Sequence, residues 1–155
     1  MIWEELKDTL ITVDLEAESY EEVMEQLGGI LIREGYCKES YVNALITREK
    51  EFPTGLDVDG VGVAIPHTDV SHVNKAGIAI GVLKKPVTFV QMGSDDENVE
   101  VGLVFMLAVV NPNEHIDQLQ RIIAVIQDKE VLSKIQKVKD TKQIIELIKE
   151  KEKTL

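Results

Sequence analysis

Residues 101–110 read Val-Gly-Leu-Val-Phe-Met-Leu-Ala-Val-Val, an apolar run without a single charged side chain. The run is continuous rather than alternating, which is typical of a β-strand that is covered on both faces. Asn111-Pro112-Asn113 follows directly and ends it. The stretch therefore predicts the central strand of a sheet that lies between two other layers.

Further short runs rich in valine and isoleucine precede this strand, and Gly, Pro, Asn and Asp residues separate them. This composition is typical of strands joined by turns. The predicted strands span residues 61–65, 77–83 and 87–90.

Helical spacing of apolar residues flanks the strand-rich middle on both sides. Ser19 and Glu22 form the Ser-x-x-Glu pattern of a capping box and open a helix over 19–34, which Gly35 stops. A second helix is predicted over 39–51, before Pro53, with Arg48 in its last turns.

Two more helices are predicted after the central strand. The first begins with Asn113 as its N-cap and continues through Ile126, and the second spans 141–149. This order predicts an α/β fold, a layered domain with a mixed central β-sheet flanked by helices. At 155 residues the chain is expected to form a single domain over 1–155.

The charge balance limits the class of partner. The chain has 28 acidic and 17 basic residues and a formal net charge of −11. Such a protein repels phosphate backbones and anionic lipids, so no nucleic acid is expected as a partner.

The cysteine count and the amino terminus indicate the compartment. The chain has a single cysteine, Cys37, which can form no internal disulfide. Cys37 fits the role of a small apolar side chain better than that of a catalytic thiol. No basic start with an apolar stretch marks a signal peptide, and no apolar run has the length of a membrane span. We expect a cytoplasmic protein.

Among three histidines, only His67 directly follows a predicted strand, in Gly-Val-Ala-Ile-Pro-His-Thr-Asp at 62–69. Many functional sites lie in the loops at strand ends. Pro66 restricts both its own φ and the conformation of Ile65, so the His67 side chain is expected to be held in one orientation. By itself this setting also fits a structural or exposed histidine.

The other candidates are individually weaker. His115 lies near the start of a predicted helix, where unpaired N–H groups favour an anion, but surface histidines also occur there. Arg48 offers donors suited to phosphate oxygens, or forms an ion pair with Glu49 or Glu51. His72 is most simply a loop histidine.

Motifs for metals and nucleotides are missing from the sequence. His67, His72 and Asp69 lack the spacing of a zinc site, and neither a Walker phosphate loop nor a dinucleotide fingerprint occurs. No cofactor and no metal are expected.

Taken together, these features resemble the fructose/mannitol (type 2) enzyme IIA family of the phosphotransferase system, over nearly the whole chain. The matching features are Arg48 in Thr-Arg-Glu, Pro-Thr-Gly at 53–55, Gly-Val-Ala-Ile-Pro-His at 62–67, and His115 after the long apolar strand.

The resemblance implies a phosphocarrier. His67 would accept phosphate from phosphorylated HPr and pass it to a IIB component, and the membrane IIC component would be served indirectly. Arg48 and His115 would flank the phosphoryl group. Many members have Gly after the phosphorylated histidine, so Thr68 is a departure that leaves open whether its hydroxyl or only its backbone contacts the group.

The sequence is similar most of all to galactitol-type IIA proteins. The shared features are Arg-Glu-x-Glu-Phe-Pro-Thr-Gly at 48–55, His72, and Asp-Asp-Glu-Asn-Val at 95–99. This implies uptake of galactitol or a related polyol. Two alternatives stay open, which are a nitrogen-type regulatory IIA protein that acts through protein partners, and a binding domain that is not phosphorylated.

Overall fold

The computed structural model describes residues 1–155 apart from the side chains of Pro112, Glu114 and His115. Its centre is a five-stranded mixed sheet with the order β1-β4-β5-β3-β2. Strands β1 and β4 pair in parallel, as do β3 and β5, whereas β4/β5 and β2/β3 are antiparallel. The strands are β1 (Ile11–Leu15), β2 (Gly55–Val58), β3 (Val61–Ala64), β4 (Gly77–Val90) and β5 (Asn98–Ala108).

Strand β5 is the middle strand, as its apolar run predicted. Leu103, Phe105 and Leu107 belong to the hydrophobic core on one face of the sheet. The alternate residues Val104 and Met106 belong to the core on the other face. Both sets are buried because successive side chains of a strand point to opposite faces.

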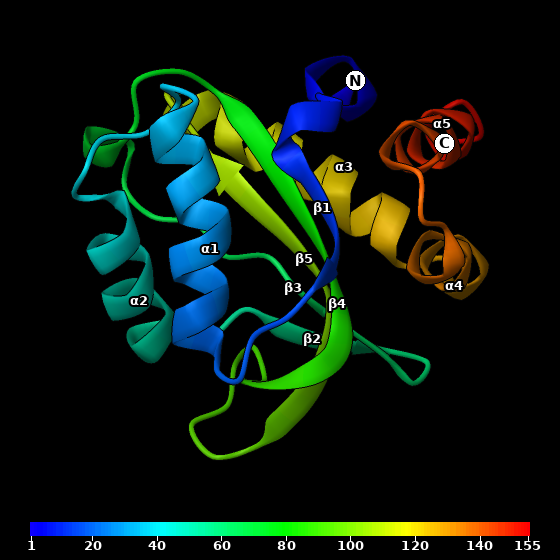
Figure 1. Ribbon diagram of the computed structural model, residues 1–155, viewed down its shortest axis with the longest axis horizontal. Helices are drawn as coiled ribbons and strands as arrows, with labels where there is room; N and C mark the ends of the chain where they lie inside the picture. The colour runs from blue at the N-terminus through cyan, green and yellow to red at the C-terminus, as the bar shows by residue number, and fades with distance from the viewer.

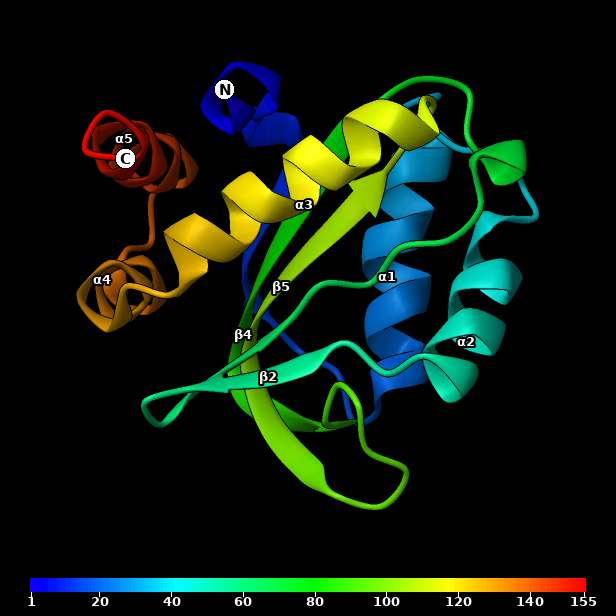
Figure 2. The same ribbon diagram turned by 180° about the vertical axis from the view of Figure 1, so that it is seen from behind.

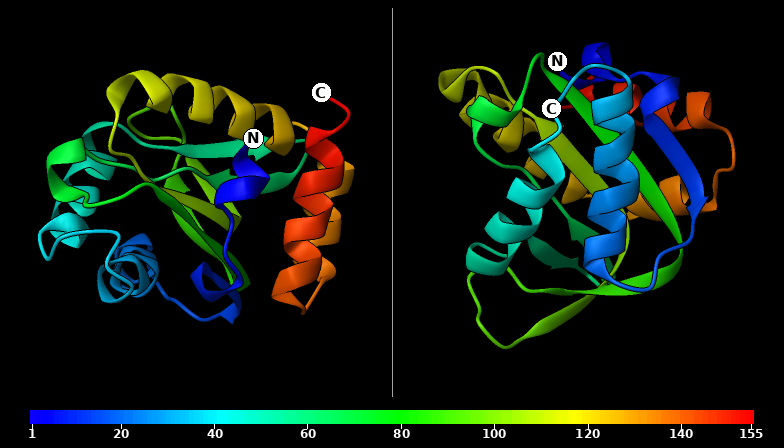
Figure 3. Two further views of the ribbon diagram at one scale, coloured as in Figure 1. Left: turned by 90° about the horizontal axis from the view of Figure 1, so that it is seen from above. Right: turned by 60° about the vertical axis from the view of Figure 1, so that its left-hand side comes forward.

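Helices cover both faces and complete a three-layer α/β arrangement (Figures 1 and 2). Seen from above, α1 and α2 lie on one side of the sheet and α3 on the other (Figure 3, left). The first two contribute to one core, and α3, α4 and α5 to the other. The helices are α1 (Tyr20–Arg33), α2 (Tyr41–Glu51), α3 (Pro112–Ile126), α4 (Lys129–Lys137) and α5 (Thr141–Glu152). The predicted fold class is confirmed.

One predicted helix cap is confirmed, and another is corrected. The Ser19 hydroxyl accepts a hydrogen bond from the Glu22 N–H at 3.2 Å, as the capping box required. The N-cap of α3 is Asn111, whose side chain accepts from the Asn113 N–H, so the prediction of Asn113 as the cap was wrong by two residues. No helix in the described part of the chain is long and apolar enough to cross a membrane.

Other element predictions also needed correction. The predicted strands 77–83 and 87–90 form one strand, β4, whose pairing with β5 shifts register between Val82 and Val87. Strands β1 and β2 and helix α4 were not predicted. Strand β1 is a short edge strand with an exposed Asp14, and α4 has only 9 residues.

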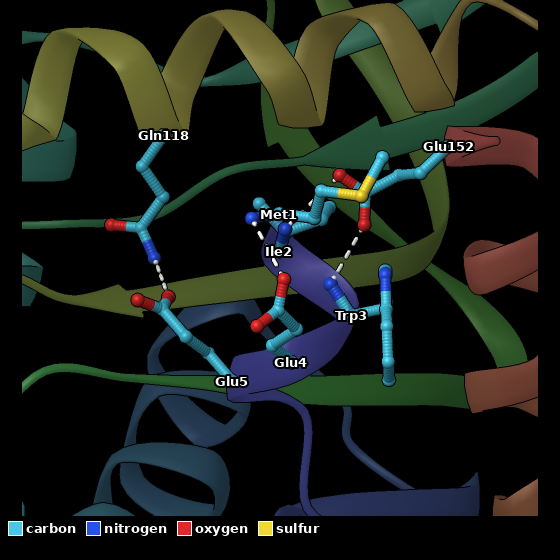
Figure 4. A network of polar contacts seen from close by, with 7 residues as sticks. All are labelled: Met1, Ile2, Trp3, Glu4, Glu5, Gln118 and Glu152. Carbon is cyan, nitrogen blue, oxygen red and sulfur yellow. Dashed lines mark hydrogen bonds and ion pairs between the residues drawn. The ribbon is translucent and has the colours of Figure 1, made fainter.

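The amino-terminal 3₁₀ turn η1 (Ile2–Glu5) is attached to α5 by a buried carboxylate. Glu152, which is 1% exposed, accepts hydrogen bonds from the N–H groups of Ile2 at 3.0 Å and Trp3 at 2.7 Å. Figure 4 shows these bonds, and also a bond from Gln118 of α3 to Glu5. The Glu152 carboxylate thus links the amino-terminal turn to the end of α5.

Replacement of Glu152 by Ala is expected to lower the free energy of unfolding by about 1.5–3 kcal/mol, because one buried and one part-buried N–H group lose a charged acceptor. Urea titration followed by circular dichroism measures the change. Glu150→Ala is the matched control on the same helix, since its exposed ion pair with Lys153 contributes less than about 1 kcal/mol. Equal stabilities for the two variants would contradict the role of Glu152.

Candidate functional site

The segment after β3 is held in place by its neighbour β5. Val63 and Ala64 pair with Leu103 and Val104 of that strand. Beyond the end of β3, the Leu107 N–H donates to the Pro66 carbonyl at 3.0 Å. His67 therefore follows a backbone that is restrained by a proline ring and by a hydrogen bond to the central strand.

The glycine at position 62 allows this close approach. A Cβ atom at Gly62 would overlap the backbone carbonyl of Glu100 in β5. A larger residue would push β3 away from β5 and displace the chain that leads to His67.

The ring of half-buried His67 has a defined orientation. Its Nδ1 atom lies 2.9 Å from the carbonyl oxygen of Ile65. A carbonyl oxygen can only accept, so Nδ1 carries the proton in the neutral ring. The lone pair of the neutral imidazole is then on Nε2, which makes Nε2 the nucleophilic nitrogen.

Arg48 lies near the end of α2, as predicted. Its guanidinium stacks on the Phe52 ring, with 4.6 Å between the central carbon and the ring centroid. Its Nε is buried and has no hydrogen-bond acceptor among the described residues. A buried donor of this kind is rare in folded proteins, and an anionic oxygen would satisfy it.

The alternative role for Arg48, an ion pair with Glu49 or Glu51, is not found in the described part of the chain. Glu49 is buried instead, and its carboxylate accepts hydrogen bonds from the backbone N–H and the hydroxyl of Thr54. Burial raises the pKa of Glu49, and the bonds from Thr54 offset part of that rise.

A cavity of about 390 Å³ brings three of the predicted residues together. Arg48 reaches it from α2, and His67 and Thr68 from the loop after β3. The remaining lining residues are Asp69, Val70, Ser71 and Val109. The fourth predicted residue, His115, has a side chain outside the described residues.

His72 has a structural position beside this cavity rather than a place in its lining. Its Nδ1 atom is 2.8 Å from the Ser40 hydroxyl, and its carbonyl accepts from the Lys38 N–H at 2.9 Å. The Lys38 ammonium also donates to the Ser71 carbonyl. These contacts fasten the turn that carries Val70 and Ser71 to the start of α2.

Two other chemistries find no support here. Cys37 is buried, and burial raises the pKa of its thiol to about 12, so the reactive thiolate is scarce at neutral pH. Among the described residues, no group of three or more His, Cys, Asp or Glu side chains is placed to hold a metal ion. The cavity lining offers an imidazole, a guanidinium, the hydroxyls of Thr68 and Ser71, and the carboxylate of Asp69.

Sequence reasoning missed Glu49 and Thr54 as parts of this site. Both stand in the quoted segment at 48–55, but nothing in their spacing shows that they are buried. A glutamate near the end of a helix is usually exposed. The turn at Pro53 brings Thr54 back against Glu49, which only the folded chain reveals.

Comparisons with known proteins identify the family of the chain. The family model for "Phosphoenolpyruvate-dependent sugar phosphotransferase system, EIIA 2" matches residues 4–151. The galactitol-specific EIIA component of Escherichia coli K12 is 32% identical over 111 residues, which cover 72% of this chain and 73% of that protein.

Two solved structures extend the likeness to the fold. The nitrogen regulatory protein IIA-Ntr from Neisseria meningitidis matches with a TM-score of 0.80 and 30% identity over 95% of this chain and 98% of its own. A chain in the Escherichia coli complex of mannitol enzyme IIA with phosphorylated enzyme IIB matches with a TM-score of 0.78 and 26% identity over 94% and 97%. The expected mannitol-type IIA fold is confirmed.

Proposed function

Because the chain belongs to the EIIA type 2 family of the phosphoenolpyruvate-dependent sugar phosphotransferase system, we propose that His67 carries a phosphoryl group between HPr and a IIB component in the cytoplasm. The observation that carries the proposal is the hydrogen bond of His67 Nδ1 to the Ile65 carbonyl, beside Arg48 in one cavity. That bond leaves the lone pair on Nε2, as a phosphoryl acceptor requires.

The transfer step needs no metal from this chain. The Nε2 lone pair of His67 attacks the phosphorus of the phosphorylated carrier, a P–N bond forms, and the bond to the carrier breaks with its electron pair. The Nδ1 proton stays on the ring, where the Ile65 carbonyl stabilises the positive charge that develops. The IIB acceptor then attacks the same phosphorus and restores neutral His67.

Arg48 and Thr68 are proposed to bind the phosphoryl oxygens. The buried Nε of Arg48 is a charged donor in need of an acceptor, and phosphoryl transfer depends mainly on positioning and charge stabilisation. Thr68 lines the same cavity. We assign His115 the same supporting role on the strength of the family pattern.

Apolar side chains beside the cavity suit a protein partner. Phe52, which stacks on Arg48, is 55% exposed, and Val110, which follows the lining residue Val109, is 41% exposed. Interfaces bury apolar and aromatic side chains at their centres. We propose that HPr and IIB dock over these residues, one after the other.

The transported sugar is proposed to be galactitol or a related polyol. The likeness to the galactitol-specific relative supports this, as does the shared segment at 48–55. A IIA domain recognises its IIB partner rather than the sugar, so the specificity would be expressed through IIB. The likeness to IIA-Ntr at 30% identity supports a nitrogen-type regulatory role as the second candidate.

Incubation with phosphoenolpyruvate, enzyme I and HPr tests the phosphocarrier role, with the acid-labile phosphate expected on the peptide that contains His67. Addition of IIB components from galactitol, mannitol and fructose systems then tests specificity, with the fastest transfer expected to the galactitol type. Phosphorylation without transfer to any of the three would favour the regulatory role instead.

A further inference from the structure

Two of the three buried polar or charged residues identified in the described part of the chain lie together beside His67. Glu49 is 5% exposed and Thr54 is 3% exposed, and the third, Glu152, lies at the distant amino-terminal turn. Burial of a carboxylate costs free energy that hydrogen bonds recover only in part. The burial of Glu49 beside Thr54 is therefore costly unless its hydrogen bonds hold some other part of the chain in place.

The hydrogen bonds of Thr54 have only one consistent assignment. Its Oγ1 atom accepts from the Ile65 N–H at 3.2 Å. The single hydroxyl proton therefore goes to Glu49, whose Oε1 lies 2.9 Å away. The Thr54 backbone N–H donates to Glu49 Oε2 at 2.7 Å, so both carboxylate oxygens are used.

The bond to Ile65 continues the sheet beyond its last backbone pair. Strands β2 and β3 are antiparallel, and Gly55 pairs with Ala64 at the end of the ladder. The next pair outward is Thr54 with Ile65, where the threonine side chain takes the place of a backbone acceptor. Glu49, near the end of α2, fixes the rotamer of that side chain by accepting its hydroxyl proton.

Ile65 is thereby held by both of its backbone groups. Its N–H is bound to Thr54, and its carbonyl accepts from His67 Nδ1. A displacement of Ile65 would lengthen the bond that determines which ring nitrogen carries the proton. Glu49 and Thr54 thus act on His67 through one residue, although neither lines the cavity.

We propose that Glu49 and Thr54 are positioning residues that set the orientation and tautomer of His67 through the backbone of Ile65. The inference rests on the proposed function, because it assigns Nε2 as the phosphoryl acceptor. A chain of hydrogen bonds connects the buried Glu49 carboxylate, the Thr54 hydroxyl and the backbone N–H of Ile65. The carbonyl of the same Ile65 then binds the His67 imidazole. An effect on the ring that can be seen without phosphate is therefore expected.

Thr54→Val removes the hydroxyl at nearly constant shape and is the main test. Its ring nitrogens, observed by ¹⁵N NMR in the unphosphorylated protein, are expected to change from the single Nδ1–H tautomer of the parent to a mixture. Transfer from phospho-HPr is expected to slow about ten- to a hundredfold at saturating HPr, with little change in apparent affinity, because geometry rather than docking is lost.

Three further variants separate positioning from stability. Thr54→Ser keeps the hydroxyl and is expected to restore both the tautomer and the rate. Glu49→Gln places an amide donor where the Thr54 groups need an acceptor. Its tautomer and transfer rate are expected to lie between those of the parent and Thr54→Val. Glu152→Gln is the matched control, a buried carboxylate with two backbone donors whose replacement is expected to leave the His67 ring unchanged.

The outcomes distinguish this inference from the function on which it rests. A parent protein that takes no phosphate would refute the phosphocarrier role, and the NMR spectra would still test the positioning of the ring. A normally phosphorylated parent, with an unchanged tautomer and rate in folded Thr54→Val, would overturn the inference alone. A slower rate that tracked only thermal stability, equally in Glu152→Gln, would also overturn it.

Discussion

The His67→Ala variant is expected to remain folded and to take up no phosphate from phospho-HPr. Alanine removes the nucleophilic nitrogen, and nothing else in the described lining of the cavity offers an imidazole. The fold should tolerate the change, since a half-buried side chain and its hydrogen bond to Ile65 contribute only about 0.5–1.5 kcal/mol. Radiolabelled phosphoenolpyruvate with enzyme I and HPr measures the uptake, and circular dichroism checks the fold.

His72→Ala is the matched control for this experiment. His72 is the nearby histidine that bonds Ser40 outside the cavity lining, so its loss should leave phosphate uptake unchanged. Phosphate on the His67→Ala protein, mapped to His72 or His115, would refute the assignment of His67.

Arg48→Ala is expected to slow transfer to His67 by roughly ten- to a hundredfold. The variant loses a charge-assisted hydrogen bond to the phosphoryl group, worth about 1.5–3 kcal/mol in the transition state. Arg48→Lys should recover only part of the rate, because an ammonium keeps the charge but lacks the planar fork and the Nε donor. Rapid-quench measurements with phospho-HPr give the rate constants.

The control for Arg48 is Arg33→Ala, which removes an exposed arginine from the last turn of α1. Its rate should equal that of the parent, so any general effect of net charge on docking is accounted for. The family pattern predicts a loss of similar size in His115→Ala. Parental rates in both Arg48→Ala and His115→Ala would remove the two residues from the mechanism.

The elements that local sequence predicted share a strong short-range signal. The run at 101–110 has no polar interruption, so the strand had to be buried on both faces wherever it lay. At the start of α1, the Ser19 hydroxyl accepts the Glu22 N–H, and the Glu22 carboxylate accepts the N–H of Glu18, so these bonds join residues that are close in sequence. The Ile-Pro-His segment restricts its own backbone through the proline ring, and so indicated a directed histidine.

The elements that were missed depend on partners far along the chain. Strand β1 is stabilised by pairing with β4, where Ile11 lies opposite Ile80. Strand β4 continues through Lys84, Lys85 and Pro86, residues that by composition end a strand, because β5 supplies partners on both sides of the register shift. A strand of five residues, such as β1, is too short to show a clear alternation of apolar and polar side chains, so its pairing could not be predicted.

By itself, the sequence determined the α/β layering and the central strand, and through its resemblance to the IIA family it indicated His67, Arg48, His115 and Thr68 as candidates for phosphoryl chemistry. Only the tertiary structure placed Arg48 beside His67 in one cavity and brought the buried Glu49 and Thr54 behind Ile65. The physical reason is that periodicity and turn chemistry are local properties of the chain. The burial of a carboxylate and the choice of a ring tautomer depend instead on which distant backbone groups pack against them.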